Sequence, residues 1–302
     1  MNLLIQLLPA ISVILFGIVA RNMKIFNQEH IKGFEIFLFK IGMPCYLFSV
    51  TFNANLNEIV NIPFIIAYLV TFVIAFTSAV LLHRKSPLSQ KLSLSLASSY
   101  SNTSLYLTPI LFFLFNNAIA GVIANLTQVL IIQSAMILIL TFLNHKKASK
   151  LKIILKIIFT PLILIPILGI VANYFNMQSY LKYPYQSIDI IGKSATGMAL
   201  FVFGLNCTSV KFLNRLEKIT ALKIVLIKNF IHPLIALFVG YFIIKLDGYW
   251  LKSLVIAASS PTAFLVYIIS NQYNANDDSI KPAIILSSIL SMFTIIFISF
   301  AL

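Results

Sequence analysis

The strongest constraint on the fold is a series of apolar blocks, each roughly 20 residues long, the length at which an α-helix crosses a bilayer core. Hydrophobic residues make up 60% of the chain and charged residues 10%. A soluble domain is about half apolar and about a quarter charged. A transmembrane β-barrel would instead show segments of about 10 residues with alternating polarity. The sequence therefore predicts an all-α, multi-pass integral membrane protein.

Ten membrane spans can be drawn from these blocks. The first block lacks the basic start of a removable signal peptide, so it too is expected to remain in the membrane. The approximate limits are Leu3–Ala20, Phe34–Phe52, Ile62–Leu82, Lys91–Phe115, Ala118–Leu143, Ile153–Phe175, Ser187–Cys207, Ala221–Ile244, Leu251–Asn271 and Ala283–Leu302.

The net charge of +14 comes mainly from basic residues between the blocks, which indicates membrane topology and not nucleic-acid binding. Cytoplasmic loops are enriched in Lys and Arg. The odd-numbered connections carry fifteen such residues and the even-numbered ones three. We therefore predict a protein of the cell (inner) membrane with both termini on its outer side. The three are Lys182, Lys245 and Lys252. The fifteen are Arg21, Lys24, Lys32, Arg84, Lys85, Lys91, Lys146, Lys147, Lys150, Lys152, Lys211, Arg215, Lys218, Lys223 and Lys281.

The order of the spans indicates an internal duplication. Five spans precede the basic segment "NHKKASKLK" (residues 144–152), and five follow it. An odd number of spans in each half forces the halves into opposite orientations, the geometry of inverted-repeat transporters. We therefore expect one membrane transport domain over residues 1–302, with repeats at about 1–145 and 146–302.

Two of the spans contain polar runs with a proline. Ser98–Ser104 is a polar run that precedes Pro109, and "AASSPTAF" places Pro261 in the middle of the ninth span. Proline disrupts helical hydrogen bonding, and broken backbone in a membrane is tolerated only inside protein or beside a wet cavity. The fourth and ninth helices are therefore predicted to be broken and to face each other. Helix N-termini exposed by such breaks favour anions.

The hydroxyls, amides and prolines of both runs are the candidate substrate site. The alternative is that the hydroxyls only hydrogen-bond within the helices and that the prolines only kink them. The candidate residues are Asn102, Thr103, Ser104, Pro109, Ser259, Ser260, Pro261 and Thr262.

Three basic side chains are candidates for ion coupling or for attracting an anion. Lys228 and Lys193 lie within spans, where a charge costs about 3 kcal/mol. The alternative for both is snorkelling or a contact within the protein. His232 could carry a proton, and the alternative is a hydrogen-bonded interior histidine. No metal or cofactor is expected.

Several stretches, taken in order, resemble one family. They are "FGIVARNMKIFNQEHIKGFEIFLFKIGMPCYLFSV", "SNTSLYLTPI", "GMALFVFGLNC", "KNFIHPL" and "AASSPTAFLVYIISNQY". The second matches through Asn102, Thr103 and Pro109, whereas Ser104 and Leu107 stand where glycines are usual. The chain is thus similar to the auxin efflux carrier family, including its bacterial malonate-permease-like members.

The resemblance implies ten helices in two inverted five-helix repeats, with the fourth and ninth broken and crossing. It implies a scaffold of helices one, two, six and seven, which in relatives mediates dimer formation, and a moving transport unit of the others. A homodimer is therefore expected. The substrate class it implies is small organic anions.

Together these features predict a secondary active transporter, a permease, for a small organic anion such as malonate. It would work by alternating access, with a proton or sodium as the coupling ion. A sodium-coupled carrier similar to bile-acid symporters is the main alternative, and a passive channel is another. An intramembrane enzyme is not expected, because deep carboxylates and a His/Cys/Asp cluster are lacking.

Overall fold

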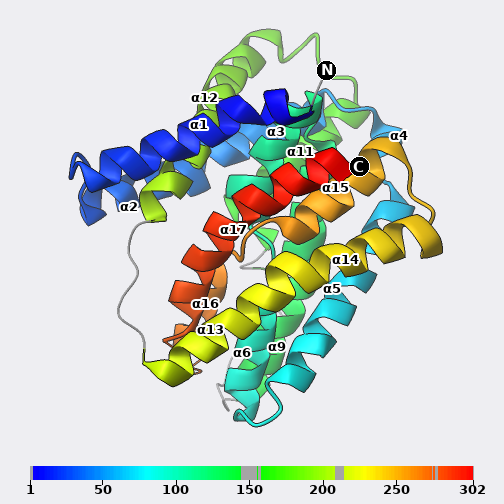
Figure 1. Cartoon of the computed structure of the whole chain (residues 1–302). Coiled ribbons are helices and arrows are strands. Elements are labelled where there is room, and N and C mark those ends of the chain that lie inside the picture. Colours follow the sequence, from blue (N-terminus) through cyan, green and yellow to red (C-terminus); the bar gives the residue numbers. More distant parts are fainter. Residues whose placement is uncertain are drawn as a thin grey trace. The chain divides into compact units, whose positions relative to one another are not determined.

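The secondary structure elements of the computed structural model are all helical in the residues that it describes (Figure 1). The β-type pairing among these residues is a single antiparallel bridge. It describes residues 3–143, 155, 158–207, 214–273, 275 and 278–301, with side chains between residues 8 and 296 of these ranges. The α-helices are α1 (Leu3–Asn22), α2 (Gln28–Phe37), α3 (Met43–Phe52), α4 (Leu56–Ile59), α5 (Ile62–Leu82), α6 (Leu88–Ser99), α7 (Thr108–Phe115), α8 (Ile119–Thr127), α9 (Ser134–Leu143), α11 (Pro161–Tyr174), α12 (Lys182–Asn206), α13 (Arg215–Leu226), α14 (His232–Phe238), α15 (Gly248–Ser259), α16 (Leu265–Gln272) and α17 (Ile280–Ala301). The π-helical turns are η1 (Leu38–Gly42), η2 (Thr103–Leu107), η3 (Gln128–Gln133), η4 (Ile227–Ile231) and η5 (Val239–Ile243).

Within the described residues, five helical stretches are long and apolar enough to cross a membrane. They are Gln28–Phe52, Leu56–Leu82, Ile119–Leu143, Lys182–Asn206 and Arg215–Ile243. Shorter apolar helices cover Leu8–Asn22, Thr103–Phe115, Pro161–Tyr174 and Ile280–Ile296. The predicted all-helical class is confirmed. The ten-span inverted repeat stays a prediction, and the basic segment 144–152 lies outside the described residues.

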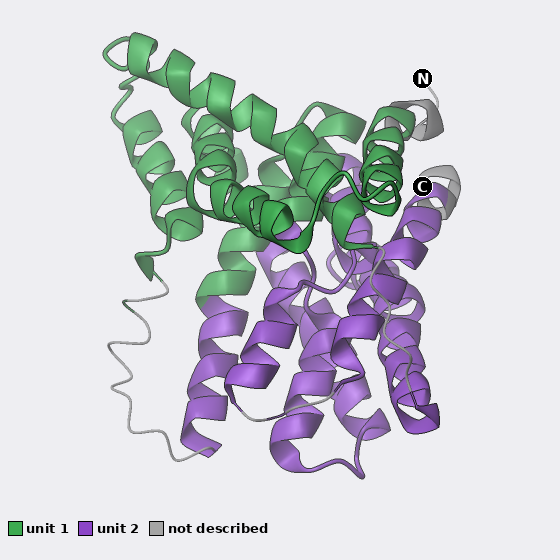
Figure 2. Cartoon of the chain, turned by 90° about the vertical axis from the view of Figure 1, so that its left-hand side faces the viewer, with its two compact units in different colours: residues 1–62, 104–130, 154–208 green, residues 63–103, 131–153, 209–302 purple. Residues whose placement is uncertain are grey.

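The chain divides into two compact units, coloured separately in Figure 2. Unit 1 comprises residues 1–62, 104–130 and 154–208, and unit 2 comprises residues 63–103, 131–153 and 209–302. Unit 1 therefore takes in the predicted first, second, sixth and seventh spans, whereas unit 2 takes in the third, eighth, ninth and tenth. The predicted fourth and fifth spans are divided between the units.

In unit 1, α1 and α12 approach each other through glycines. A Cβ atom on Gly17 would overlap the carbonyl oxygen of Phe201, and a Cβ atom on Gly204 would overlap the carbonyl oxygen of Ile14. Small residues let helix backbones come close in a membrane, where van der Waals contact between helices drives packing. The two glycines therefore determine how closely these helices pack.

The end of α3, also in unit 1, is completed by side chains from the α11 region. Asn173 is buried, and its Nδ2 donates to the carbonyl oxygens of Thr51 at 2.9 Å and Ala54 at 2.8 Å. Gln178 Nε2 donates to the carbonyl oxygen of Phe52 at 3.3 Å. The last carbonyls of a helix lack partners within the helix. Asn173 and Gln178 thus satisfy groups that would otherwise be buried and unpaired.

Asn173→Ala is expected to destabilise the protein by about 2 kcal/mol, because two buried carbonyls lose their donor. Thermal unfolding of the purified protein in detergent would show a melting temperature lowered by a few degrees. Gln178→Ala removes two longer hydrogen bonds of an exposed side chain, to the Phe52 carbonyl oxygen at 3.3 Å and to Asn173 Oδ1 at 3.1 Å, and should have a smaller effect. Equal effects of the two substitutions would contradict this account of the α3 end.

Three of the eleven prolines follow π-helical turns. The turns η1, η2 and η4 each end two residues before Pro44, Pro109 or Pro233. A proline ring crowds the carbonyl one turn earlier and lacks an N–H, and a π-helical turn widens the helix at that point. Pro109 therefore lies within the helical stretch Thr103–Phe115. The expectation that Pro109 itself breaks the helix is wrong: the chain leaves the helix at Tyr100.

Candidate functional site

In unit 2, two apolar helices stop and pair with each other where they stop. α6 ends at Ser99, and α15 ends at Ser259. An antiparallel bridge joins Ser101 to Thr262. The Asn102 N–H donates to the Pro261 carbonyl oxygen at 2.8 Å, and the Ala263 N–H donates to the Tyr100 carbonyl oxygen at 3.4 Å. We call Tyr100–Asn102 together with Ser260–Ala263 the paired break.

The pairing explains how backbone outside a helix is stable in an apolar setting. Neither segment could satisfy its amides and carbonyls alone, and such groups are costly when unpaired away from water. Each segment supplies a donor and an acceptor to the other, at positions about 160 residues apart in the sequence. The polar run Ser98–Ser104 and the run around Pro261 are therefore one local structure.

Most hydroxyls of the two runs donate to helix carbonyls. Ser98 and Ser99 donate to the carbonyl oxygens of Leu94 and Ser95, each at 2.9 Å. Ser259 and Ser260 do the same in α15, to Val255 at 2.7 Å and to Ile256 at 2.9 Å. This back-bonding by serine is common in helices and occupies the single donor of each hydroxyl. The serine oxygens keep acceptor capacity, but their donors are committed.

Thr262 ties the two helices together at the paired break. Its Oγ1 donates to the carbonyl oxygen of Ala97 at 2.6 Å, and its N–H donates to Ser287 Oγ of α17 at 3.3 Å. Both groups are buried. Among the candidate substrate residues, Asn102 is the one that is partly exposed, since the others are buried.

Lys228 lies against the paired break and is fully buried, with 0% of its surface exposed. Its Nζ is 2.7 Å from Ser101 Oγ, 3.0 Å from the Ala258 carbonyl oxygen and 3.3 Å from Nδ1 of His232. His232 lies one turn further along the same helical stretch and is also buried. The alternative that Lys228 snorkels to the surface is therefore wrong, because its ammonium group has three contacts inside the protein.

Further polar side chains extend this cluster within unit 2. The Tyr68 hydroxyl is hydrogen-bonded to Ser101. The Tyr100 hydroxyl donates to Gln133 Oε1 at 2.9 Å. Ser101 was not singled out from the sequence, although it lies inside the polar run. Only its contacts with both helices and with Lys228 distinguish it from the neighbouring serines.

The remaining sequence candidates lie in unit 1. Ser104 is buried and donates to Asn125 Oδ1 at 2.8 Å. Lys193 has a side chain that is 70% exposed and forms an ion pair of 2.6 Å with Asp189, one turn away. An exposed pair of this kind contributes little to stability. Lys193 is therefore a surface residue with a contact within the protein, which is the alternative to a role in attracting an anion.

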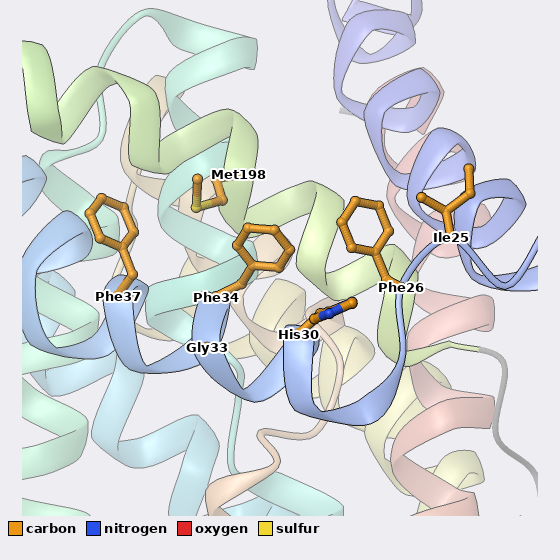
Figure 3. A pocket seen from close by; sticks show the side chains of 7 residues that line it. All are labelled: Ile25, Phe26, His30, Gly33, Phe34, Phe37 and Met198. Atoms are coloured by element: carbon orange, nitrogen blue, oxygen red, sulfur yellow. The ribbon is translucent and has the colours of Figure 1, made fainter.

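A cavity of about 650 Å³ lies in unit 1 and is shown in Figure 3. Phe26, Phe34 and Phe37 come from the α2 region, and Met198 of α12 faces them. None of the candidate substrate residues lines it. Its lining is aromatic and aliphatic apart from His30, so it lacks the convergent polar groups expected around a small anion.

Interrupted apolar helices with polar groups at the breaks are typical of secondary transporters, and this arrangement places the chain in the class of membrane transport proteins. The family model described as "Membrane transport protein" matches residues 2–299. The chain therefore belongs to this family, which is the auxin efflux carrier family indicated by the motifs. It is also similar to the "Putative malonate transporter" of Rhizobium meliloti (strain 1021), with 25% identity over 315 residues, covering 95% of this chain and 92% of the relative.

Proposed function

We propose that this protein is a secondary active transporter of a small organic anion, such as malonate or another mono- or dicarboxylate, that works by alternating access. The observation that carries the proposal is the paired break in unit 2, which joins two interrupted apolar helices beside a buried lysine. Family membership supports transport as the function. The name of the Rhizobium meliloti relative supports a dicarboxylate as the substrate.

The charge distribution at the paired break favours an anion. α16 begins at Leu265, directly after the break, and no side chain caps its first turn. The N–H groups of Val266 and Tyr267 donate to the carbonyl oxygens of Ala263 and Phe264 at 3.1 and 3.0 Å, so the start of α16 attracts an anion mainly through the partial positive charge of about one half at a helix N-terminus. Asn102 is the partly exposed polar side chain at the same break. We propose that the substrate carboxylate binds between Asn102 and the start of α16.

We further propose that unit 2, which holds the paired break, is the moving transport unit and that unit 1 is the scaffold through which a homodimer forms. The excess of lysine and arginine in the odd-numbered connections supports termini outside the inner membrane. The ten-span inverted repeat belongs to the same proposal, because two antiparallel halves would provide the two symmetric states that alternating access requires.

Asn102→Ala is expected to lower malonate uptake about tenfold, because one hydrogen bond to a charged group contributes on the order of 1.5 to 3 kcal/mol. The measurement is uptake of radiolabelled malonate into proteoliposomes with an imposed pH gradient. Asn57→Ala is the matched control, since Asn57 is exposed in α4 and its side chain forms no hydrogen bond with the described residues. Its uptake should equal that of the native protein.

Each outcome of this experiment bears on a different part of the proposal. Saturable, gradient-driven uptake that falls with Asn102→Ala supports both the carboxylate substrate and the binding position. Uptake unchanged by Asn102→Ala would show that the substrate does not bind at Asn102. If the folded protein takes up no malonate, malonate is not its substrate, and the next experiment is a thermal-shift screen of other small anions. Flux without saturation or counterflow would indicate a channel.

A further inference from the structure

The end of α15 at the paired break presents carbonyl oxygens that require a positive partner. α15 ends at Ser259, so its last carbonyls lack N–H donors within the helix. The Ile256 carbonyl oxygen accepts from Ser260 Oγ, and the Ala257 carbonyl oxygen accepts from the Ser260 N–H and from Ser101 Oγ. The Ala258 carbonyl oxygen is the one that meets a basic side chain. The C-terminal end of a helix carries about half a negative charge. In membrane transporters, such half-helix ends and unwound carbonyls are the groups that coordinate a sodium ion.

Lys228 already occupies this position. Its Nζ donates to the Ala258 carbonyl oxygen at 3.0 Å and contacts Ser101 Oγ, from the other segment of the paired break, at 2.7 Å. One ammonium group thereby bridges both interrupted segments. Lysine near a helix C-terminus is known to bond the last carbonyls and to interact favourably with the helix dipole.

The hydrogen atoms at Ser101 fix the direction of these bonds. Ser101 has one hydroxyl hydrogen, and it is donated to the Ala257 carbonyl oxygen at 2.7 Å. Ser101 Oγ must therefore accept from Lys228. The Ala258 carbonyl can only accept as well. In the tautomer that carries its ring hydrogen on Nε2, His232 Nδ1 also accepts, and the three contacts of Nζ then match the three N–H donors of an ammonium group.

Charge compensation at this place comes from dipoles. Within the described part of the chain, no carboxylate forms an ion pair with Lys228. The ion pair that the described residues do form is Asp189 with Lys193. A buried cation without a counter-charge is costly unless fixed carbonyls and hydroxyls solvate it. The ends of α15 and of the Tyr100–Asn102 segment provide that solvation.

We propose that the ammonium group of Lys228 is a resident, covalently tethered cation of the paired break, at the position where a free monovalent cation would otherwise bind. The protein should then require no sodium for folding or for substrate movement. The resident cation is independent of the proposed substrate, whereas sodium-free transport rests on the proposed transport function.

The test replaces the tethered cation by a free one. Lys228→Ala removes three methylene groups and the ammonium, which together correspond to propylammonium. The variant is expected to melt about 5 °C below the native protein in detergent. Propylammonium at millimolar concentrations should restore about half of that loss by binding in the vacated space. Equal concentrations of 1-propanol, which matches the size without the charge, should not.

Two further variants keep the test decisive. Lys218→Ala, on the same helical stretch but exposed, should melt as the native protein does and should not respond to propylammonium. Lys228→Met keeps most of the length of the side chain and loses its charge, so it should also melt lower. It covers the case in which the alanine variant does not fold. Restoration by 1-propanol equal to that by propylammonium, or a native melting temperature for Lys228→Met, would overturn the proposal.

Sodium provides a second readout without substrate. Exchanging choline for sodium should leave the melting temperature of the native protein unchanged. In Lys228→Ala, sodium should raise it, because the carbonyl and hydroxyl oxygens at Ala258 and Ser101 are then free to bind a cation. Sodium stabilisation of the native protein would overturn the proposal. Failure of malonate uptake with these thermal results intact would count against the substrate alone.

Discussion

Gly204→Val is expected to lower the stability of the protein by at least about 3 kcal/mol, the largest effect of any substitution considered for unit 1. The new Cβ would fall on the carbonyl oxygen of Ile14, and Gly17 lies against the same position. A backbone carbonyl cannot rotate away as a flexible side chain can, so α1 and α12 would have to separate. Thermal unfolding should show a melting temperature lower by roughly 5 °C or more.

Gly197 in the same helix provides the matched control. A Cβ at Gly197 would have no atom within 4 Å. Gly197→Ala should therefore stabilise the protein slightly, by about 0.5 to 1 kcal/mol, because alanine is the better helix former. Similar losses of stability for Gly204→Val and Gly197→Ala would show that helix α12 is sensitive to any substitution. The close α1–α12 contact would then not explain the effect of Gly204→Val.

Ser101→Ala is expected to cost about 3 kcal/mol, because one buried hydroxyl serves three partners. The Ala257 carbonyl oxygen loses one of its two donors, Lys228 loses an acceptor, and Tyr68 loses a hydrogen-bond partner. An ammonium left with an unsatisfied N–H in a buried site carries most of this cost. If the proposed transport function is correct, malonate uptake should fall in parallel with the loss of stability.

Ser194→Ala separates this effect from the general loss of a serine hydroxyl. Ser194 is exposed and donates to the Ile191 carbonyl oxygen at 2.8 Å, a back-bond like those of Ser98 and Ser259. Its replacement should change stability by less than about 0.5 kcal/mol. A Ser101→Ala variant as stable as Ser194→Ala would mean that the Ser101 hydroxyl has no special place in unit 2.

Several features of this protein could be read from the sequence because they depend on local chemistry. Apolar blocks of membrane length predict helices, since a helix satisfies its own backbone in lipid. The runs Ser98–Ser104 and Ser259–Thr262 mark departures from that rule, and the structure places the helix interruptions at these two runs. Motif order indicated the family, which the family model confirms.

The role of Pro109 was predicted wrongly, and the hydrogen bonds of single serines could not be predicted. The sequence attributed the first interruption to Pro109, but the chain leaves the helix at Tyr100, and a π-helical turn accommodates the proline. Substrate binding by the hydroxyls of Ser259 and Ser260 stays a prediction; their hydrogens are donated to carbonyls one turn back, so the oxygens keep acceptor capacity alone. A serine looks the same in the sequence whether its hydroxyl donates to its own helix or to another group. Only the local backbone decides which partner it has.

By itself, the sequence determined that this chain is helical, lies in a membrane, belongs to a transport family and breaks its helices at two polar runs. The tertiary structure alone decided that Ser101 pairs with Thr262, that Lys228 is buried against both segments, and that Gly17 meets Gly204. The physical reason is sequence distance. Helix formation depends on neighbours within one turn, whereas these contacts join residues from 30 to about 190 positions apart, which only packing of the folded chain brings together.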